Sequence, residues 1–474
     1  MTFQRTPLLS ALFCLLSGLA RSQGLPDRLH AATERLTADT ALRHAIVSLQ
    51  VINAATGAIV FGENAEAGLA PASCQKLFTS VAALDLLGPD YRYRTGLGYD
   101  GRLENGQLQG NLYIIGSGDP TLGSWRYDST REEVILDRWV SALARNGIKR
   151  FSGDILIDDS LGGTQAVPRG WILEDIGNYY GAGAWGLNWH ENQFDLHLKA
   201  GKAIGDPVTL VKPPGELEFT EWINECKTGP AGSGDNAYIY STPHMGFAFL
   251  RGTIPLQKEG FVISGSIPAP PRYAGILFGE RLQKEGVIQH AGEVMTPLGI
   301  SLENQKMNHP SVILDTCLSP RLDSINYWFL KKSINLYGEA LVKTLAVEKA
   351  GAVGTEKGVQ VVRDFWIARG IDGGSIHIQD GSGLSPQNRV TTDALVKVLL
   401  YAKSRPWFHA FYSALPEING MHMKSGAIGG ARSYAGYQHS ADGHEYVFAI
   451  IVNNYDGPTA PVIRKIFALL DLLK

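Results

Sequence analysis

The chain has 474 residues, of which 44% are hydrophobic and 19% are charged, and its formal net charge at pH 7 is −3. These values are ordinary for a soluble globular protein, and the length suggests two or three domains. The near-neutral balance argues against nucleic acid or an anionic membrane as a partner, because bulk electrostatic binding to either needs an excess of basic residues.

The first 22 residues have the pattern of a secretory signal peptide. Arg5 precedes an apolar run over residues 8–20, and small residues follow at Ala20 and Ser22. Such a run is too short to span a bilayer comfortably. We expect cleavage near Ser22–Gln23. We also expect a periplasmic mature protein without a transmembrane anchor, because no later segment is apolar enough to span a membrane.

Three cysteines remain after the expected signal peptide: Cys74, Cys226 and Cys317. An odd number argues against a disulfide framework, and a core of this size does not need one. A pair between Cys226 and Cys317 stays open. Cys74 is interpreted as a small buried apolar residue.

The first predicted elements are a β-hairpin and a helix. Strands are expected over residues 45–52 and 58–61, with a turn between them. Pro71 stops the chain before an apolar helix that contains Ser73 in its first turn and ends before Gly88-Pro89.

Ser73 and Lys76 form the only S-x-x-K in the chain. Residues three apart share a helix face, so the lysine amine can lie against the serine hydroxyl and act as its base when neutral. The helix N-terminus adds donors where an oxyanion would form. Alone, the motif is weak evidence, since a capping serine and a solvent-exposed lysine are then the preferred explanation.

Residues 97–289 are interpreted as an insertion of mainly β character with two possible subdomains. Short apolar runs such as 111–115 and 154–157 alternate with glycine-rich turns, and one helix is expected over residues 131–146. The stretch 227–235 is expected to be a loop.

From about residue 290 the pattern becomes helical again. Two motifs occur here: Ser333-Ile334-Asn335 on a predicted helix and Lys424-Ser425-Gly426 on a predicted strand. The other elements expected here are helices over 321–345, 355–369 and 392–402, strands from 421 and over 446–453, and a C-terminal amphipathic helix from Pro461 that packs on a sheet.

The order S-x-x-K, S-x-N, K-[S/T]-G is that of penicillin-binding proteins and class A β-lactamases. The surrounding sequence resembles the D-alanyl-D-alanine carboxypeptidase/endopeptidase family of serine peptidases, the S13 type, which carries a long insertion between the first two motifs. The resemblance covers nearly the whole mature chain and rests on PASCQKLFTS, GSGDPTL, GDILIDDS, KKSINLYGEAL, DGSGLSPQNRVT and KSGAIGGARSYAGY.

Two sequences compete with these motifs. Lys227-Thr228-Gly229 is a more literal K-T-G, but it precedes the S-x-N and lies in the inserted region. An earlier S-x-N begins at Ser324, although its flanking residues do not match the family. We therefore prefer Ser333 and Lys424.

The resemblance implies a role for each residue. Ser73 attacks the carbonyl between two D-alanines, Lys76 takes its proton, and Ser333 relays a proton to the leaving amine. Burial and a charged Lys424 would both lower the pKa of Lys76. The remaining residues are expected to bind the substrate: Asn335 its amide, Lys424 and Ser425 its carboxylate, and the backbone N–H groups of Ser73 and Ala427 its oxyanion.

Two positions differ from the usual family pattern. Ser425 replaces threonine and keeps the hydroxyl, which puts fine substrate preference in doubt rather than the mechanism. Ile334 stands where aspartate is common. Asp380 and Ser382 are interpreted as parts of a structural loop.

The implied fold is α+β, an antiparallel β-lactamase/transpeptidase-like sheet flanked by helices. Residues 23–96 and 290–474 would form this domain and residues 97–289 the insertion. The expected function is cleavage of D-Ala-containing bonds in peptidoglycan stem peptides, with β-lactams as acylating inhibitors and no metal or cofactor. The alternatives are a serine β-lactamase, for which no E-x-x-L-N pattern is found, and a non-catalytic wall-binding module, which would usually have lost a motif.

Overall fold

The computed structural model describes residues 24–212, 221–257, 260–288 and 292–474. The expected signal peptide lies outside them. Among the described residues, no helix is both long and apolar enough to cross a membrane.

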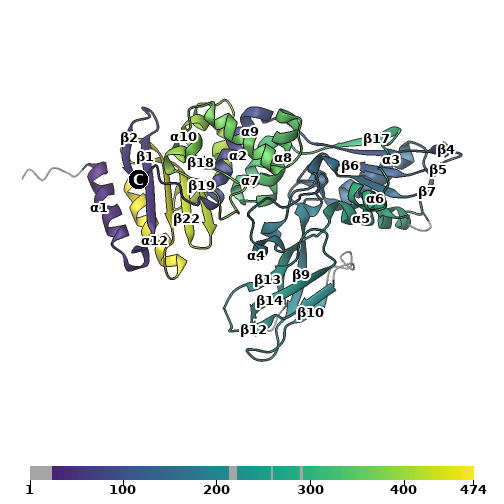
Figure 1. Cartoon of the computed structure of the whole chain (residues 1–474), viewed down its shortest axis with the longest axis horizontal. Coiled ribbons are helices and arrows are strands. Elements are labelled where there is room, and N and C mark those ends of the chain that lie inside the picture. Colours follow the sequence, from purple (N-terminus) through teal and green to yellow (C-terminus); the bar gives the residue numbers. More distant parts are fainter. Residues whose placement is uncertain (1–23, 213–220, 258–259, 289–291) are drawn as a thin grey trace, which may run out of the picture.

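The expected antiparallel sheet is present and has six strands in the order β2-β1-β23-β22-β21-β20. The first two strands form the predicted hairpin, and the other four come from the C-terminal part of the chain (Figure 1). The strands are β1 Ile46–Asn53, β2 Ile59–Glu63, β20 Glu417–Ile418, β21 Met421–Ile428, β22 Ala431–His439 and β23 Glu445–Asn453.

Both faces of this sheet are covered, because its central strand is apolar on both sides. In β23, Phe448 and Ile450 pack toward α1 and α12, whereas Val447 and Ala449 pack toward α2 and α10. This alternation follows from the two-residue period of a strand. The C-terminal helix therefore packs on the sheet, as predicted. The helices of this part are α1 Leu25–Thr37, α2 Lys76–Leu87, α7 Leu322–Lys331, α8 Asn335–Ala350, α9 Thr355–Ile367, α10 Thr392–Lys403, α11 Phe408–Ala414 and α12 Thr459–Leu470.

The strands inserted after α2 form two further groups, to the right of and below the sheet in Figure 1. The first group is a five-stranded sheet, β16-β8-β6-β3-β17, with α3 and α5 packed on it. Its elements are β3 Arg94–Tyr99, β6 Leu112–Ile115, α3 Glu132–Arg145, β8 Ile155–Asp158, α5 Pro270–Lys284, β16 Val294–Met295, α6 Pro297–Leu302 and β17 Val312–Leu318, with a small sheet of β4 Arg102–Glu104, β5 Gln107–Gln109 and β7 Arg150–Ser152 beside them.

The second group contains a three-stranded and a four-stranded sheet around one shared core. Its elements are α4 Leu173–Ile176, β9 Gln193–Lys199, β10 Thr209–Lys212, β11 Glu221–Asn224, β12 Lys227–Gly229, β13 Asn236–Tyr240, β14 Phe247–Pro255 and β15 Phe261–Ser266. A short pair of strands, β18 Ile376–His377 and β19 Arg389–Val390, lies outside both groups.

Three expectations about local structure were wrong or incomplete. The insertion contains a second long helix, α5, whose start at Pro270-Pro271 is a helix-initiating signal. The strand β17 lies in a region expected to be helical, and it pairs with β3. Residues 227–229 form the strand β12 rather than a loop, because they pair with β14. Cys74, Cys226 and Cys317 are free, which agrees with the expectation against disulfides and settles the pair that the sequence left open.

The pairing of β17 with β3 also bears on the domain boundary. Because β17 completes the sheet of the inserted strands, we propose that the insertion runs to about Leu318 rather than to residue 289.

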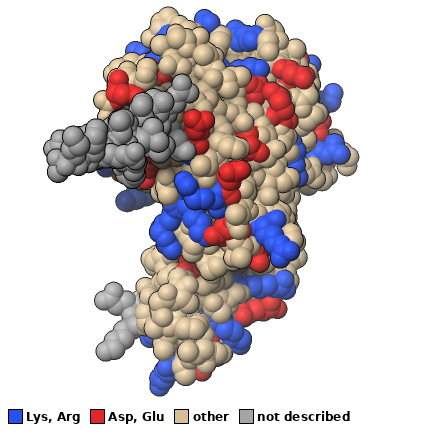
Figure 2. Space-filling model, turned by 90° about the vertical axis from the view of Figure 1, so that its left-hand side faces the viewer, with Lys and Arg blue, Asp and Glu red and all other residues tan. Residues whose placement is uncertain are grey.

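The face drawn in Figure 2 carries Lys, Arg, Asp and Glu side chains interspersed, in keeping with the small net charge.

Candidate functional site

Ser73 lies in a single 3-10 turn, Ala72–Gln75, directly before α2. The sequence predicted this residue in the first turn of the helix itself, so its position is correct to within one turn. The turn is packed tightly between two segments. A Cβ on Gly426 of β21 would lie 2.5 Å from the carbonyl oxygen of Pro71, and a Cβ on Gly383 would lie 1.9 Å from that of Ala72. Glycine at both positions therefore allows strand and loop to approach the serine.

Lys76 is fully buried, and its amine has three polar neighbours. Nζ lies 3.0 Å from Ser73 Oγ, 2.6 Å from Asn335 Oδ1 and 2.7 Å from the carbonyl oxygen of Ser382. The amide of Asn335 is held in this orientation because its Nδ2 donates to the carbonyl oxygen of Tyr180 at 2.8 Å. Asn335 Oδ1 and the carbonyl oxygen of Ser382 can only accept hydrogen bonds, so each takes one N–H of the Lys76 amine. The third position on the amine nitrogen then faces Ser73.

The electrostatic environment favours the neutral amine. Burial lowers the pKa of Lys76 well below its usual value, and the positive charge of Lys424 lowers it further. The negative charge of Asp380, and that of Glu339 when it is ionised, act in the opposite direction. A neutral amine has two hydrogens and one lone pair. Two hydrogens can then serve the two acceptors, and the lone pair can face the hydroxyl of Ser73. This is the arrangement that a general base beside a nucleophile needs.

The S-x-N motif does not lie on a continuous helix, contrary to the prediction. Helix α7 ends at Lys331 and α8 begins at Asn335, and Ser333 between them has a left-handed backbone with φ of 57°. The sequence contains no glycine or proline at this break that would have predicted it. As a result Asn335 occupies the first position of α8 and reaches Lys76, while Ser333 precedes it in the loop.

The K-S-G motif lies on β21, as predicted, beside the turn that carries Ser73. Cys74 Sγ donates to the carbonyl oxygen of Lys424 at 3.3 Å. Lys424 is buried, which lowers its pKa to about 8, while Ser425 is half-buried and Ala427 is exposed. Strand β20 pairs only with Met421 and His422, so within the described sheet the outer edge of β21 has no strand partner from Lys424 onward.

The loop 380–385 contributes more than the sequence indicated. Asp380 accepts hydrogen bonds from Trp171, Gly383, Ser385 and Asn388 and thereby fixes the loop. This structural role was expected. The contact of the Ser382 carbonyl oxygen with Lys76 was not expected, because every residue type has the same backbone carbonyl and the sequence cannot indicate its contacts.

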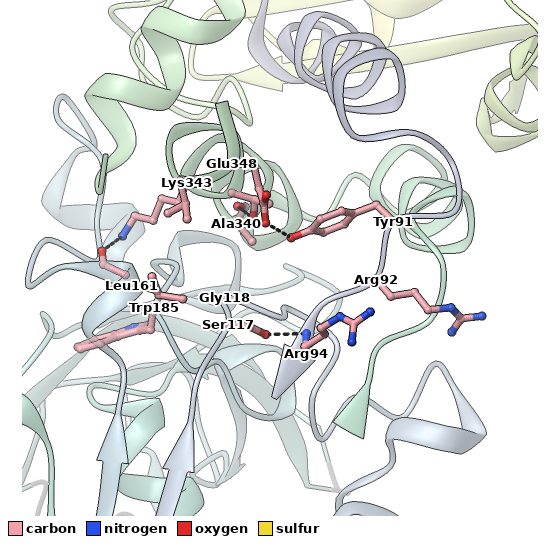
Figure 3. A pocket seen from close by; sticks show the side chains of 13 residues that line it. Tyr91, Arg92, Arg94, Ser117, Gly118, Leu161, Trp185, Ala340, Lys343 and Glu348 are labelled. Carbon is pink, nitrogen blue, oxygen red and sulfur yellow. Dashed lines mark hydrogen bonds between the residues drawn. The ribbon is translucent and has the colours of Figure 1, made fainter. Parts of the chain in front are cut away.

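The inserted region also contacts the site through α8. Besides the Tyr180–Asn335 bond, Lys343 donates to three carbonyl oxygens of the insertion, those of Gly162, Gln165 and Ala184. Figure 3 shows Lys343 and Trp185 on one side of a cavity of about 180 Å³, opposite Arg92 and Arg94. Helix α8 is therefore held by the insertion at Asn335 and at Lys343.

Glu339 is a buried carboxyl group close to Lys76 that the sequence reasoning did not identify. It lies on α8 one turn after Asn335, and its Oε2 accepts from Gly381 N at 3.1 Å. Its Oε1 has no hydrogen-bond partner among the described residues. Burial, followed by the charge of Asp380, raises the pKa of Glu339 to about 8. The group is therefore mainly protonated and neutral at pH 7.

We expect Glu339→Gln to gain stability over the wild type as the pH rises. The folded protein keeps a proton up to about pH 8 that the unfolded chain releases near pH 4.5, so the wild type loses stability across this window. An amide does not ionise and removes that loss. The difference in Tm should therefore move in favour of the variant between pH 5 and pH 9, measured by circular dichroism.

The control is Glu356→Gln, which changes an exposed glutamate of α9. Its Tm difference from the wild type should stay constant over the same pH range. A constant difference for Glu339→Gln as well would show that the buried carboxyl is already ionised in the folded protein at pH 5.

The competing K-T-G lies away from this arrangement. Lys227 is exposed on β12, in the four-stranded sheet of the insertion, whereas Lys424 is buried beside Ser73. Ser324, which begins the earlier S-x-N, is exposed on α7. The structure thus brings together Ser73, Lys76, Asn335 and the strand of Lys424.

Residues 29–471 match the model of the D-Ala-D-Ala carboxypeptidase 3 (S13) family. A D-alanyl-D-alanine carboxypeptidase of Actinomadura sp. (strain R39) is 28% identical, with 91% of this chain and 82% of that protein covered. The D-alanyl-D-alanine carboxypeptidase DacB of Haemophilus influenzae is 25% identical, with 84% and 83% covered. The crystal structure of penicillin binding protein 4 from H. influenzae superposes with a TM-score of 0.79 at 23% identity, over 94% of this chain and 98% of that one. That likeness shows that the two share a fold.

Proposed function

Because the chain belongs to the D-Ala-D-Ala carboxypeptidase 3 (S13) family, a family of hydrolases, we propose that it is a serine D,D-carboxypeptidase and endopeptidase of peptidoglycan stem peptides. The observation that carries the proposal is the set of three contacts around Lys76 Nζ, which suits a neutral amine with its lone pair toward Ser73. In keeping with the expected signal peptide, the enzyme would act in the periplasm.

Acylation would begin with attack of Ser73 Oγ on the carbonyl carbon between two D-alanines, while the hydroxyl proton passes to Lys76 Nζ. The tetrahedral oxyanion would be bound by the backbone N–H groups of Ser73 and Ala427. The close packing of Gly426 against the turn of Ser73 supports this pairing, since it holds the two segments in van der Waals contact.

Collapse of the intermediate would break the C–N bond and leave an ester on Ser73. The proton held by Lys76 would reach the leaving amine through Ser333, which lies two residues before the Asn335 that contacts Lys76. Water would then hydrolyse the ester, with Lys76 again acting as the base, and restore the free serine. A β-lactam would acylate the same hydroxyl by opening of its ring.

Substrate would bind along the open edge of β21. An extended peptide can add to an exposed strand through main-chain hydrogen bonds. In that position its amide would face Asn335, and its terminal carboxylate would face Lys424 and Ser425. The direct test of the activity is release of D-alanine from an acyl-D-Ala-D-Ala peptide, together with cleavage of a cross-linked muropeptide for the endopeptidase reaction. Absence of both products would refute the proposal.

Replacing Lys424 by alanine is expected to impair carboxylate recognition selectively. A hydrogen bond to a charged group contributes roughly 1.5–3 kcal/mol, so kcat/KM for an acyl-D-Ala-D-Ala acid should fall about 10- to 150-fold. The same peptide amidated at its C-terminus should lose much less, because it presents no carboxylate. Steady-state kinetics on both substrates measure the difference.

Lys227→Ala is the matched control, since it removes the lysine of the competing K-T-G from an exposed strand. It should change neither rate by more than about twofold. Two outcomes would show that the carboxylate is bound elsewhere. One is an equal loss of kcat/KM on the acid and the amide for Lys424→Ala, and the other is a large loss of kcat/KM for Lys227→Ala.

A further inference from the structure

A second cavity, of about 510 Å³, lies in the inserted region and has a mixed aromatic and polar lining. Four aromatic residues border it together with three polar ones. The aromatic residues are Trp125, His190, Phe194 and Tyr273, and the polar residues are Gln193, Asp195 and Ser264. None of these residues takes part in the chemistry proposed above. A cavity lined by apolar surface and a few polar groups is the usual form of a small-molecule site.

Trp125 provides a rigid aromatic surface at this cavity. Its side chain is 43% exposed, although it is held between two neighbours. The His190 ring lies 4.9 Å from its ring, centroid to centroid, and the guanidinium of Arg126 lies 5.3 Å from its centroid. Arg126 is itself fixed, since it lies 5.3 Å from the ring of Trp328 on α7. These contacts reduce the conformational entropy that the tryptophan would lose on binding a ligand.

The backbone at His190, which borders the cavity, is strained. His190, Glu191 and Asn192 have consecutive φ values of 53°, 51° and 53°. For residues other than glycine a left-handed conformation costs on the order of 1–2 kcal/mol each, and such strain is concentrated at functional sites.

The carboxylate of Glu191 holds this strained turn in place. It accepts hydrogen bonds of 2.8 Å from Ser124 Oγ, Arg126 Nε and the hydroxyl of Tyr337. Tyr337 lies on α8 two residues after Asn335. The wall of the cavity is therefore joined to the helix that carries part of the proposed active site.

The polar side of the cavity presents planar hydrogen-bonding groups to a ligand. Ser264 Oγ donates to one carboxylate oxygen of Asp195 at 2.7 Å, which orients the carboxylate and leaves its other oxygen for a second donor. Asp195 is exposed, and the amide of Gln193 lies on the same wall. The negative charge of Asp195 disfavours an anionic ligand and favours one rich in hydroxyl or amide donors.

An aromatic face beside a carboxylate and an amide matches the two kinds of surface on a pyranose ring. Its C–H faces are apolar and stack on an indole, while its hydroxyl and N-acetyl groups hydrogen-bond to planar polar side chains. We propose that this cavity binds a sugar unit of the glycan strand of peptidoglycan. The identity of the sugar polymer rests on the proposed function, because the stem peptides of that substrate are attached to such a strand.

The test uses the mature chain and a peptide-free probe, the β-1,4-linked hexamer of N-acetylglucosamine, titrated by isothermal calorimetry. The wild type is expected to bind it, and Trp125→Ala to weaken binding at least about fivefold through loss of the stacking surface. Trp125→Phe, which keeps an aromatic ring, should retain most of the affinity. Tyr238→Ala, which removes a 42% exposed aromatic from β13 outside the cavity, is the matched control and should bind like the wild type.

Absence of binding by the wild type at millimolar hexamer would overturn the proposal. Equal weakening by Trp125→Ala and Tyr238→Ala, or an equal loss in Trp125→Phe and Trp125→Ala, would overturn it as well. Ser73→Ala should bind the hexamer as the wild type does, so the sugar site can fail or succeed independently of the proposed peptidase activity.

A second measurement compares the turnover of insoluble peptidoglycan with that of a soluble peptide. Trp125→Ala should lose at least about fivefold more turnover on insoluble peptidoglycan than on a soluble acyl-D-Ala-D-Ala peptide, because only the polymer carries the sugars. Equal losses on the two substrates would contradict a role of the cavity in holding the glycan strand.

Discussion

Ser73→Ala is expected to abolish both the covalent adduct with benzylpenicillin and the release of D-alanine. Lys76 Nζ lies 3.0 Å from the hydroxyl that this substitution removes. Loss of a nucleophile that acts together with its base removes nearly all covalent catalysis, so the rate should fall by about 10⁴-fold or more. Intact-mass analysis after incubation with benzylpenicillin, followed by digestion, locates the adduct.

Cys74 offers the matched control because it is the neighbouring nucleophilic side chain. Burial raises the pKa of its thiol to about 11, so the thiol is protonated and unreactive at neutral pH. Cys74→Ala should therefore keep the adduct on Ser73. An adduct found on Cys74, or one that survives Ser73→Ala, would refute the assignment of the nucleophile.

Lys76→Arg is expected to be nearly as damaging as Lys76→Ala. A guanidinium stays protonated in proteins and cannot accept the proton of Ser73. It also has no lone pair to offer, whereas the two acceptors beside Nζ suit an amine with two hydrogens and one lone pair. General base catalysis contributes about 10²- to 10⁴-fold, so both variants should lose acylation rate in that range.

The rates can be followed as the growth of the penicillin adduct with time. Lys332→Arg is the control, since Lys332 is an exposed lysine beside the S-x-N motif, and it should acylate at the wild-type rate. Substantial acylation by Lys76→Arg would mean that Lys76 acts as a fixed charge and that another group takes the proton.

The three sequence motifs and the strongest elements of the fold could be recognised in the sequence because their signals are local. The hairpin of β1 and β2, the helix α2 and the strand β23 follow from apolar runs and the turn residues between them. The spacing of Ser73 and Lys76 is likewise enough to place the two side chains together, and motif order was enough to prefer Lys424 to Lys227.

Elements whose conformation depends on distant partners could not be predicted in this way. The strand β17 exists because it pairs with β3, more than 200 residues earlier in the chain, and β12 exists because it pairs with β14. The break before α8 places Ser333 in a left-handed conformation without glycine or proline. Tertiary packing outweighs helix propensity at that position.

The sequence by itself therefore determined which residues we propose to carry the chemistry, since short spacing paired Ser73 with Lys76 and the family resemblance implied the role of each motif residue. Only the tertiary structure decided how the base is held. The carbonyl oxygens of Ser382 and Tyr180 orient Lys76 and Asn335, and Glu339 lies buried near them. Every residue has a backbone carbonyl, so the sequence does not show which carbonyl will contact Lys76; the folded chain decides that. The burial that lowers the pKa of Lys76 likewise exists only in the folded protein.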